Sequence, residues 1–530
     1  MKKFKYLSLF ALSLAFIGCD VNNELEEFKA PEEEMVALNG NSIDFSNYVS
    51  IGASFTAGFA DGALFKAGQE SSFPNILATK FALVGGGDFK QPLMSDNIGG
   101  LLFGGTKIQE PRLYFNGSGP VRLSDTPTTD VVVSVRGDLN NYGIPGAKSF
   151  HILAPGYGNP AGVPLGLANP YFARMSSTNS TTVLADALGQ APTFFTLSEI
   201  GGNDVLGFAT SGGFNAPNAA NPAGFNAKYQ SDPTVSPADY GGNDITNVDV
   251  FAQVFSGMVD ALTAGGRKGV VANLPNITDL PYFTTVPFNA VPLNEATATQ
   301  LNGAFAAYNA GLQQVLDLKN ANQLPAQVLP LLANYNQAEV DRRKVSFVAG
   351  QNAVLILDEN LSNLTPINAA LTNMRQATSA DLLVLTSSSF IGTTVGGNAQ
   401  LINGVSVPLA DQWVLTPEEQ ELVATATDSY NTTIQNIATA KGLAFVDFKD
   451  ILTQAKTTGL MFDGNNLTTS LVTGGLVSLD GIHLTGRGYA LMANKMLAAI
   501  DVTYGSNFTL ATNGLAKAEN YPTNYSPSLK

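Results

Sequence analysis

Short runs rich in β-branched and aromatic residues recur along this chain, and long helix-like segments separate several of them. The helix-like segments include residues 248–262, 294–318 and 417–440, and the strand-like runs lie at 48–51, 131–135, 193–197, 269–272, 345–348, 354–357 and 444–448. Helices that connect successive strands act as crossovers, which favour a mainly parallel sheet covered by helices. The sequence therefore predicts the α/β class.

Two helices have clear end signals. Thr416 precedes Pro417 and two glutamates, and Gly442 follows the predicted last turn. Thr485 is the predicted cap of a final helix that runs to about residue 500. Ser, Thr, Asn and Asp are the residues that accept hydrogen bonds from the free N–H groups of a first helical turn, and glycine commonly ends a helix.

The balance of residue types excludes several classes of function. The 530 residues include 28 Lys and Arg against 43 Asp and Glu, and the only tight basic cluster after residue 5 is 342–344, so nucleic acid is not an expected partner. One Cys and two His are too few to build a zinc site, and an intrachain disulfide is impossible. We expect no metal and no organic cofactor. A histidine general base can only be His151 or His483.

The first residues read as a targeting signal. Three lysines precede an apolar stretch at 6–17, which is too short to span a bilayer and predicts a signal peptide over residues 1–18. Ala-Phe-Ile-Gly-Cys at 15–19 resembles the lipobox of bacterial lipoproteins, which implies lipidation of Cys19. Membrane attachment through this anchor is then expected in the bacterial cell envelope, on the periplasmic or surface face of the outer membrane.

The composition of the remaining residues predicts three parts, a tether, one large domain and a C-terminal tail. Residues 19–43 carry a run of glutamates and predict a solvated tether. Residues 44–505 are expected to form one large domain, and 506–530 a C-terminal tail. Stretches near 207–246 and 360–412 are rich in Gly, Asn, Ser and Thr, which predicts large insertions within that domain.

A candidate nucleophile follows the first predicted strand. Gly-Ala-Ser-Phe-Thr-Ala-Gly at 52–58 places Ser54 among small residues at a strand-to-helix turn. Such a turn exposes a hydroxyl at the carboxyl edge of a parallel sheet, where open α/β folds hold their sites. Taken alone, the pattern is more typical of a turn or of a serine that caps a helix.

Candidate oxyanion donors lie in two further segments. Gly146 belongs to a glycine-containing turn, and Asn203 in Gly-Gly-Asn-Asp follows a buried strand. Asn243 lies in a second Gly-Gly-Asn-Asp, but a loop-rich stretch precedes that copy. We therefore favour Asn203 over Asn243.

The most informative segment is Asp-Gly-Ile-His-Leu-Thr at 480–485. A carboxylate three residues before a histidine can orient the imidazole and stabilise its protonated form, so Asp480 and His483 are a candidate acid–base pair. His151 has no acid nearby in the sequence and lies among apolar residues, so packing or a pocket wall is its expected role.

These four segments, in this order, resemble the SGNH (GDSL-type) hydrolases. The resemblance implies a flavodoxin-like three-layer α/β/α fold with a mainly parallel sheet and large insertions. It also implies a triad of Ser54, His483 and Asp480, and an oxyanion hole formed by Ser54, Gly146 and Asn203. The family's usual Gly-Asp-Ser is Gly-Ala-Ser here, so the support that the acid gives to the serine turn is missing at Ala53.

The resemblance implies a serine ester hydrolase of the carboxylesterase or lipase kind, acting through an acyl-enzyme on Ser54. The expected substrate is a small-molecule, lipid or acylated-glycan ester. The alternatives are a polysaccharide or glycan O-deacetylase of the same fold, and a catalytically inactive surface-binding lipoprotein.

Overall fold

The computed structural model describes residues 36–218 and 220–530. The predicted signal peptide, Cys19 and most of the tether therefore lie outside the described residues. The chain divides after Ala37, and every element described below belongs to the part that begins at Leu38.

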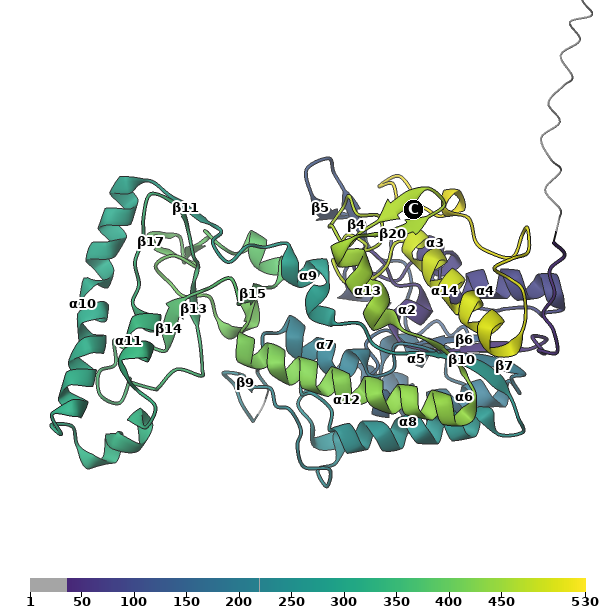
Figure 1. Ribbon diagram of the computed structural model, residues 1–530, viewed down its shortest axis with the longest axis horizontal. Coiled ribbons are helices and arrows are strands. Elements are labelled where there is room, and N and C mark those ends of the chain that lie inside the picture. The colour runs from purple at the N-terminus through teal and green to yellow at the C-terminus, as the bar shows by residue number, and fades with distance from the viewer. Residues whose placement is uncertain (1–35, 219) are drawn as a thin grey trace, which may run out of the picture. The chain divides into compact units, whose positions relative to one another are not determined.

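A five-stranded parallel sheet forms the centre of this part (Figure 1). Its strands, in chain order, are β1 (Tyr48–Gly52), β6 (Asn141–Gly143), β7 (Phe194–Leu197), β10 (Lys268–Ala272) and β19 (Ala444–Val446). They lie side by side as β19-β10-β7-β1-β6, and all four pairings are parallel. With the strands numbered in chain order this is 2-1-3-4-5, the order of flavodoxin-like sheets. The predicted α/β class and parallel sheet are confirmed.

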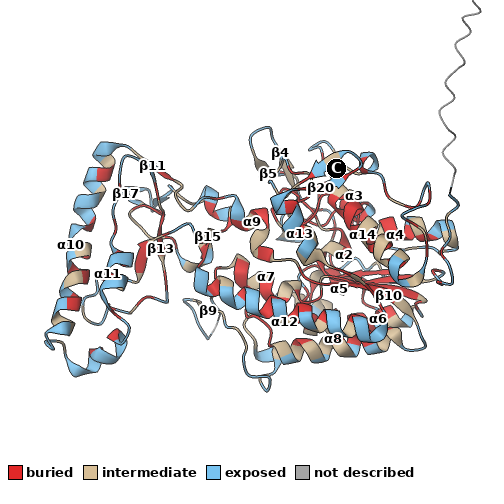
Figure 2. Ribbon diagram, viewed as in Figure 1, coloured by how far each residue is buried: buried red, intermediate tan, exposed pale blue. Residues whose placement is uncertain are grey.

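Helices cover both faces of the sheet (Figure 1). On one face, α14 (Gly486–Tyr504) packs on β10, β19 and α4 (Phe73–Phe81). On the other, α12 (Pro417–Lys441) packs on β10, β19 and α8 (Val248–Thr263). Because both faces are covered, β1 and β7 are buried along their whole length, as Figure 2 shows for the sheet.

The predicted helix caps are present. The Thr416 N–H donates to Glu419 Oε2 at 2.7 Å in a capping box, and α12 ends at Gly442, which has a φ of 62°. Thr485 Oγ1 accepts a hydrogen bond from the Gly488 N–H at 2.9 Å at the start of α14. The sequence signals therefore located both helices correctly.

Between α9 (Pro281–Thr284) and α12 the chain forms two hydrophobic clusters that are separate from the main core. The helix predicted at 294–318 is confirmed as α10 (Glu295–Asn320), and it packs here with α11 (Gln337–Arg343). Within the same segment β13 (Leu355–Leu357) pairs with β14 (Met374–Gln376) in an antiparallel pair. The apolar run at 354–357 is thus a strand, but it is not part of the central sheet.

Two predicted strands are wrong. At 345–348 the extended backbone bonds to asparagines of α10, because the N–H groups of Val345 and Phe347 donate to Asn309 Oδ1 and Asn302 Oδ1 at 2.9 and 2.8 Å. At 131–135 the chain turns, and Asp130 Oδ1 accepts from the Val132 N–H at 3.1 Å. A β-branched run forms a strand only next to a partner strand, and within residues 36–218 and 220–530 neither segment pairs with one.

The remaining elements are short. Paired strands lie outside the central sheet as β2 (Leu101–Phe103) with β3 (Thr106–Gln109), β4 (Leu113–Phe115) with β5 (Pro120–Arg122), β8 (Phe214–Asn215) with β9 (Phe225–Asn226), β11 (Val291–Leu293) with β12 (Gly350–Asn352), β15 (Leu382–Leu383) with β18 (Val414–Leu415), β16 (Thr394–Val395) with β17 (Asn398–Ile402), and β20 (Leu460–Phe462) with β21 (Asn465–Leu467). The other α-helices are α2 (Ser54–Ala57), α3 (Lys66–Glu70), α5 (Pro170–Met175), α6 (Val183–Gly189), α7 (Gly202–Thr210) and α13 (Phe448–Thr457).

The last residues pack on the body of the protein. Phe508 is fully buried in the main core, and Tyr525 contacts Phe65 edge to face. Arg112 is also fully buried, and its Nη2 donates to the carbonyls of Ser526 and Leu529. The segment predicted as a tail is therefore held by a buried cation. Among the described helices, none has the length and apolar character needed to cross a membrane.

Candidate active site

Two neighbouring strands bring the first candidate residues to one edge of the sheet. Ser54 opens α2 directly after β1, and Asn203 lies in the first turn of α7, which follows β7. In a sheet of this order the connections from β1 and its neighbour β7 diverge to opposite faces, which leaves a crevice at their carboxyl ends. The candidate nucleophile and the candidate oxyanion donor therefore flank the position where such folds bind ligands.

The backbone approaches very closely at the start of α2. A Cβ atom on Gly52 would lie 2.1 Å from Thr56 Oγ1 and 2.7 Å from Glu199 Oε1, so only glycine fits between the strand and the turn. Ser54 is 9% exposed, and within the described residues its hydroxyl makes no hydrogen bond. The tight turn thus leaves Oγ available.

Glu199 holds this turn, and the sequence analysis did not identify it. Its Oε1 accepts hydrogen bonds from the N–H groups of Ala53 at 2.7 Å and Thr56 at 2.8 Å, one on each side of Ser54. Burial raises the pKa of Glu199 to about 7, although the hydrogen bonds from Thr56 and Ala53 oppose that rise. The carboxylate that holds the Ser54 turn therefore comes from the end of β7 and not from the turn itself.

Glu199 also has an unusual backbone. Its φ of 48° lies in the left-handed region, which costs a residue other than glycine roughly 1 kcal/mol or more. The second carboxylate oxygen, Oε2, is buried and has no hydrogen-bond partner among residues 36–218 and 220–530. Because only folding brings the end of β7 against the α2 turn, no local pattern could have identified this contact.

Three groups are arranged as candidate oxyanion donors. The N–H groups of Ser54 and Gly146 have no acceptor in the described part of the chain, and Gly146 has a φ of 80° with open space where a Cβ would lie. Asn203 Nδ2 donates one hydrogen to the Ala147 carbonyl at 2.9 Å, which leaves its second hydrogen free. This bond fixes the side-chain amide beside the Gly146 turn.

Asp204 links the same two segments more firmly. Its buried carboxylate accepts from the Ser149 N–H at 2.8 Å and from the Ser149 hydroxyl at 2.7 Å. The Gly146 turn is therefore held against the first turn of α7 by two adjacent residues, Asn203 and Asp204. The sequence analysis recognised the asparagine but not the structural role of the acid that follows it.

The predicted acid–base pair is formed. Asp480 Oδ2 lies 2.8 Å from His483 Nδ1, and Oδ1 accepts from the N–H groups of Ile482 and His483, both at 2.9 Å. Burial alone would raise the pKa of Asp480, but the nearby His483 and these hydrogen bonds hold it well below its usual value. An ionised Asp480 fixes the imidazole so that Nε2 is available as a base.

Contacts with the segment after Ser54 hold this pair in place. The His483 ring lies 5.6 Å from the Phe55 ring and 4.5 Å from the Phe59 ring, measured between centroids. The Gly62 N–H donates to Asp480 Oδ2 at 2.8 Å, and Asp61 Oδ1 accepts from the Leu479 N–H at 3.0 Å. The histidine segment is therefore fastened to the serine segment, although more than four hundred residues separate them in the chain.

The two competing candidates are occupied elsewhere. Asn243 Nδ2 donates to the Phe214 carbonyl at 2.7 Å and helps to hold the β8–β9 loop. The His151 ring stacks on Tyr157 at 4.3 Å, and its Nδ1 accepts from the Lys148 N–H at 3.1 Å. Burial lowers the pKa of His151 to about 4, so it is neutral at pH 7.

An apolar pocket connects the candidate residues. Ser54, Asn203 and Ile482 line one pocket together with the side chains of Phe55, Leu206, Leu274, Pro275, Ile277 and Leu280. The nucleophile and the amide donor therefore face a common space, and the residue before His483 forms part of its wall. Apolar walls with a few convergent polar groups are typical of ligand sites.

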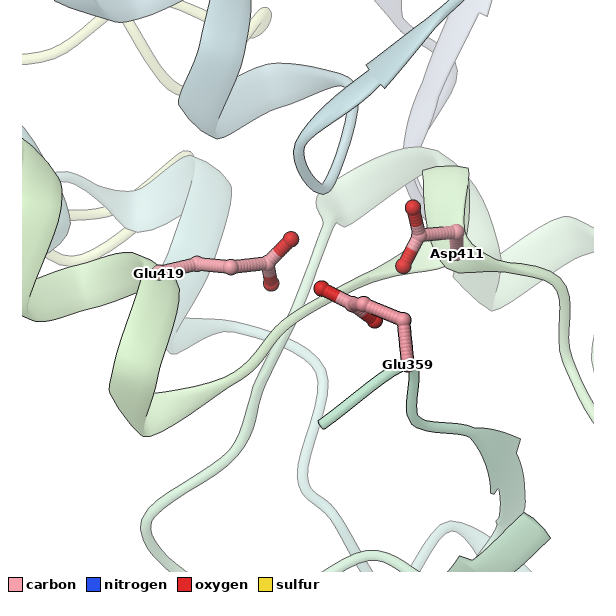
Figure 3. A group of neighbouring side chains, drawn as sticks. All are labelled: Glu359, Asp411 and Glu419. Atoms are coloured by element: carbon pink, nitrogen blue, oxygen red, sulfur yellow. The ribbon is translucent and has the colours of Figure 1, made fainter. Parts of the chain in front are cut away.

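A group of three carboxylates lies apart from this pocket. Glu359, Asp411 and Glu419 each have an oxygen within 4.8 Å of the other two, and Figure 3 shows the three side chains converging. Burial, and next the charge of Glu359, raise the pKa values of Asp411 and Glu419. Carboxylates this close share protons or bind a hard cation such as Ca²⁺. The numbers of Cys and His residues, which exclude a zinc site, carry no information about a group made only of carboxylates.

Comparisons with protein-family models, curated proteins and solved structures find no match.

Proposed function

We propose that this protein is an ester hydrolase of the SGNH type that acts through an acyl-enzyme on Ser54. The observation that carries the proposal is the His483–Asp480 pair, with a 2.8 Å bond between the side chains, fastened against the turn that bears Ser54. Nucleophilic acyl transfer needs a histidine oriented by an ionised carboxylate and a serine hydroxyl that can reach it, and the contact of His483 with Phe55, the residue after Ser54, supports this pairing.

In the first half-reaction Ser54 Oγ attacks the ester carbonyl carbon and His483 Nε2 takes the hydroxyl proton. The carbonyl oxygen becomes an oxyanion, which accepts hydrogen bonds from the N–H groups of Ser54 and Gly146 and from Asn203 Nδ2. The C–O bond to the alcohol then breaks, and His483 returns its proton to the leaving oxygen. Asp480 stays ionised and stabilises the imidazolium that forms in between.

In the second half-reaction a water molecule gives a proton to His483 and attacks the acyl carbonyl. The tetrahedral intermediate breaks its bond to Ser54 Oγ, which recovers the proton from His483. The carboxylic acid leaves, and every proton is returned. The residues that carry these steps need neither a metal nor an organic cofactor.

The same proposal includes the location of the protein. A lipid on Cys19 would anchor the chain in the bacterial envelope, with residues 19–43 as a tether between the membrane and the hydrolase body. Replacing Cys19 by Ser should release the protein from the membrane fraction. Persistent membrane association of that variant would refute the anchor and leave the hydrolase proposal intact.

Turnover of p-nitrophenyl esters and of acetylated glycans by the full-length chain tests the hydrolase proposal. We expect turnover by the wild type and loss of at least about 10³-fold in kcat for Ser54→Ala and for His483→Ala, because each removes a member of the triad. His151→Ala is the matched control, since it makes the same substitution at the other histidine, and it should retain most of the activity. Equal loss in the two histidine variants, or no wild-type turnover above Ser54→Ala on any ester, would refute the proposal.

A further inference from the structure

A second apolar cavity lies next to the Ser54 pocket, between α13 and α14. Its walls include Phe448, Ile451 and Leu452 of α13 and Leu491 and Met492 of α14. Leu452, Leu491 and Met492 are buried, whereas Phe448 and Ile451 are partly exposed, so the space lies between the two helices and is partly open to the surface. A space with apolar walls is a typical ligand site.

The cavity and the Ser54 pocket share walls. Phe55, Glu199, Pro275, Leu280 and Ile482 line both spaces. Phe55 directly follows Ser54, and Ile482 directly precedes His483, so the shared wall is made by the neighbours of the triad. The cavity therefore adjoins the pocket that a group attached to Ser54 would occupy.

A charged outer pocket adjoins the cavity on another side. Ile451 and Lys495 line the cavity and also line that outer pocket together with Asp447 and Asp450. The apolar walls of the cavity fit a flexible alkyl chain better than they fit a sugar, whose hydroxyl groups would lose their hydrogen bonds to water on entry.

We propose that the cavity between α13 and α14 binds the acyl chain of the ester, so that the substrates are esters of medium-chain and long-chain carboxylic acids. This inference rests on the proposed acyl-enzyme mechanism. The acyl group, unlike the alcohol, stays attached to Ser54 between the two half-reactions, so an apolar space next to the Ser54 pocket suits it. The alcohol must leave by the open side.

A pair of methionine variants on α14 tests the cavity. Met492 lines it, whereas Met496, one turn later and fully buried, does not. In full-length protein, Met492→Phe should lower the ratio of kcat/KM for p-nitrophenyl decanoate to that for p-nitrophenyl acetate by at least about tenfold, because a rigid ring replaces a flexible side chain in the wall and obstructs the cavity. Met496→Phe makes the same substitution in the same helix and should leave the ratio unchanged.

Two results of this series would overturn the proposal. One is a wild-type preference for acetate over decanoate, as expected of a deacetylase. The other is an equal change of the ratio in both methionine variants. A rate that depends on the alkyl length of the alcohol in a series of acetates, and not on acyl length, would likewise assign the cavity to the alcohol and refute the proposal.

A binding measurement separates the cavity from the catalysis. The Ser54→Ala protein should bind the fluorescent fatty acid cis-parinaric acid saturably, and decanoic acid should displace it. Adding Met492→Phe should weaken this binding at least fivefold, and adding Met496→Phe should not. Saturable, Met492-dependent binding without turnover of any ester would refute the hydrolase proposal alone, whereas no saturable binding would refute the cavity as an acyl site.

Discussion

Glu199 decides how the serine turn of this protein is supported. The residue before Ser54 is Ala53, which carries no acid, and Glu199 Oε1 accepts hydrogen bonds from the N–H groups of Ala53 and Thr56. Its left-handed φ of 48° is a strained conformation, and such strain persists where the surrounding structure fixes the residue. We interpret Glu199 as a positioning residue, because it acts on Ser54 through the backbone.

Variants at Glu199 should separate the effect of its hydrogen bonds on activity from the effect of its charge. Glu199→Ala removes the acceptor for both N–H groups and should lower kcat for a p-nitrophenyl ester by roughly 10²-fold, since small displacements of a nucleophile have that effect. Glu199→Gln keeps an acceptor oxygen and should retain activity within about tenfold. Because the pKa of Glu199 is about 7, the glutamine variant should also lose any inflection near pH 7 from the pH profile of kcat.

Glu70→Ala on the exposed surface of α3 is the control for these variants and should behave as the wild type. Full activity of Glu199→Ala would show that the turn around Ser54 does not need this carboxylate. An unchanged inflection near pH 7 in Glu199→Gln would assign that titration to another group.

At the scale of elements, end signals identified helices better than residue composition identified strands. Thr485 and Thr416 each precede a helix that begins where the sequence predicted. A cap works through contacts within four residues, so the sequence is enough to specify it. By contrast, β6 contains Asn141 and Gly143, which are poor strand formers, and it is held in the sheet by pairing with β1.

Removing the Thr485 cap should destabilise the protein. Thr485 Oγ1 accepts from the Gly488 N–H and donates to the Gly475 carbonyl at 2.7 Å, so it links α14 to the preceding segment. Thr485→Ala should lower the free energy of unfolding by about 1 kcal/mol, the usual value of an N-cap. The check is the midpoint of urea unfolding. Thr485→Ser keeps the hydroxyl and should lose less than half as much, and equal losses would show that the cap contributes nothing.

At the scale of the whole molecule, buried carboxyl groups set the dependence of stability on pH. Burial raises the pKa of Asp61 to about 7 and that of Glu199 to about 7, from 3.8 and 4.5. The folded protein therefore holds protons that the unfolded chain has released. The contribution of these two carboxyl groups to the free energy of unfolding is fully present below about pH 4 and is lost as the pH rises through 7. Asp480 acts in the opposite sense, because its lowered pKa favours the folded state above about pH 4.

Urea unfolding at several pH values tests this expectation. EDTA is present so that no divalent cation replaces protons at the cluster of three carboxylates formed by Glu359, Asp411 and Glu419. The unfolding midpoint should fall between pH 5 and pH 8. Asp61→Asn removes one titrating group and should make the decrease of the unfolding midpoint between pH 5 and pH 8 smaller. Asp88→Asn at an exposed position should leave that decrease unchanged. A midpoint that rises with pH, or equal slopes in the two variants, would contradict the assignment.

The sequence by itself determined the α/β class, the ends of the main helices and the His483–Asp480 pair, because each depends on residues that are close together in the chain. Only the tertiary structure decided which apolar runs joined the central sheet, since the runs at 131–135 and 354–357 have strand-like compositions as clear as that of β7. It also decided that Glu199 supports Ser54 and that α13 and α14 leave a cavity beside it. These features arise where segments distant in the chain meet, and neither short-range periodicity nor local spacing specifies such a meeting.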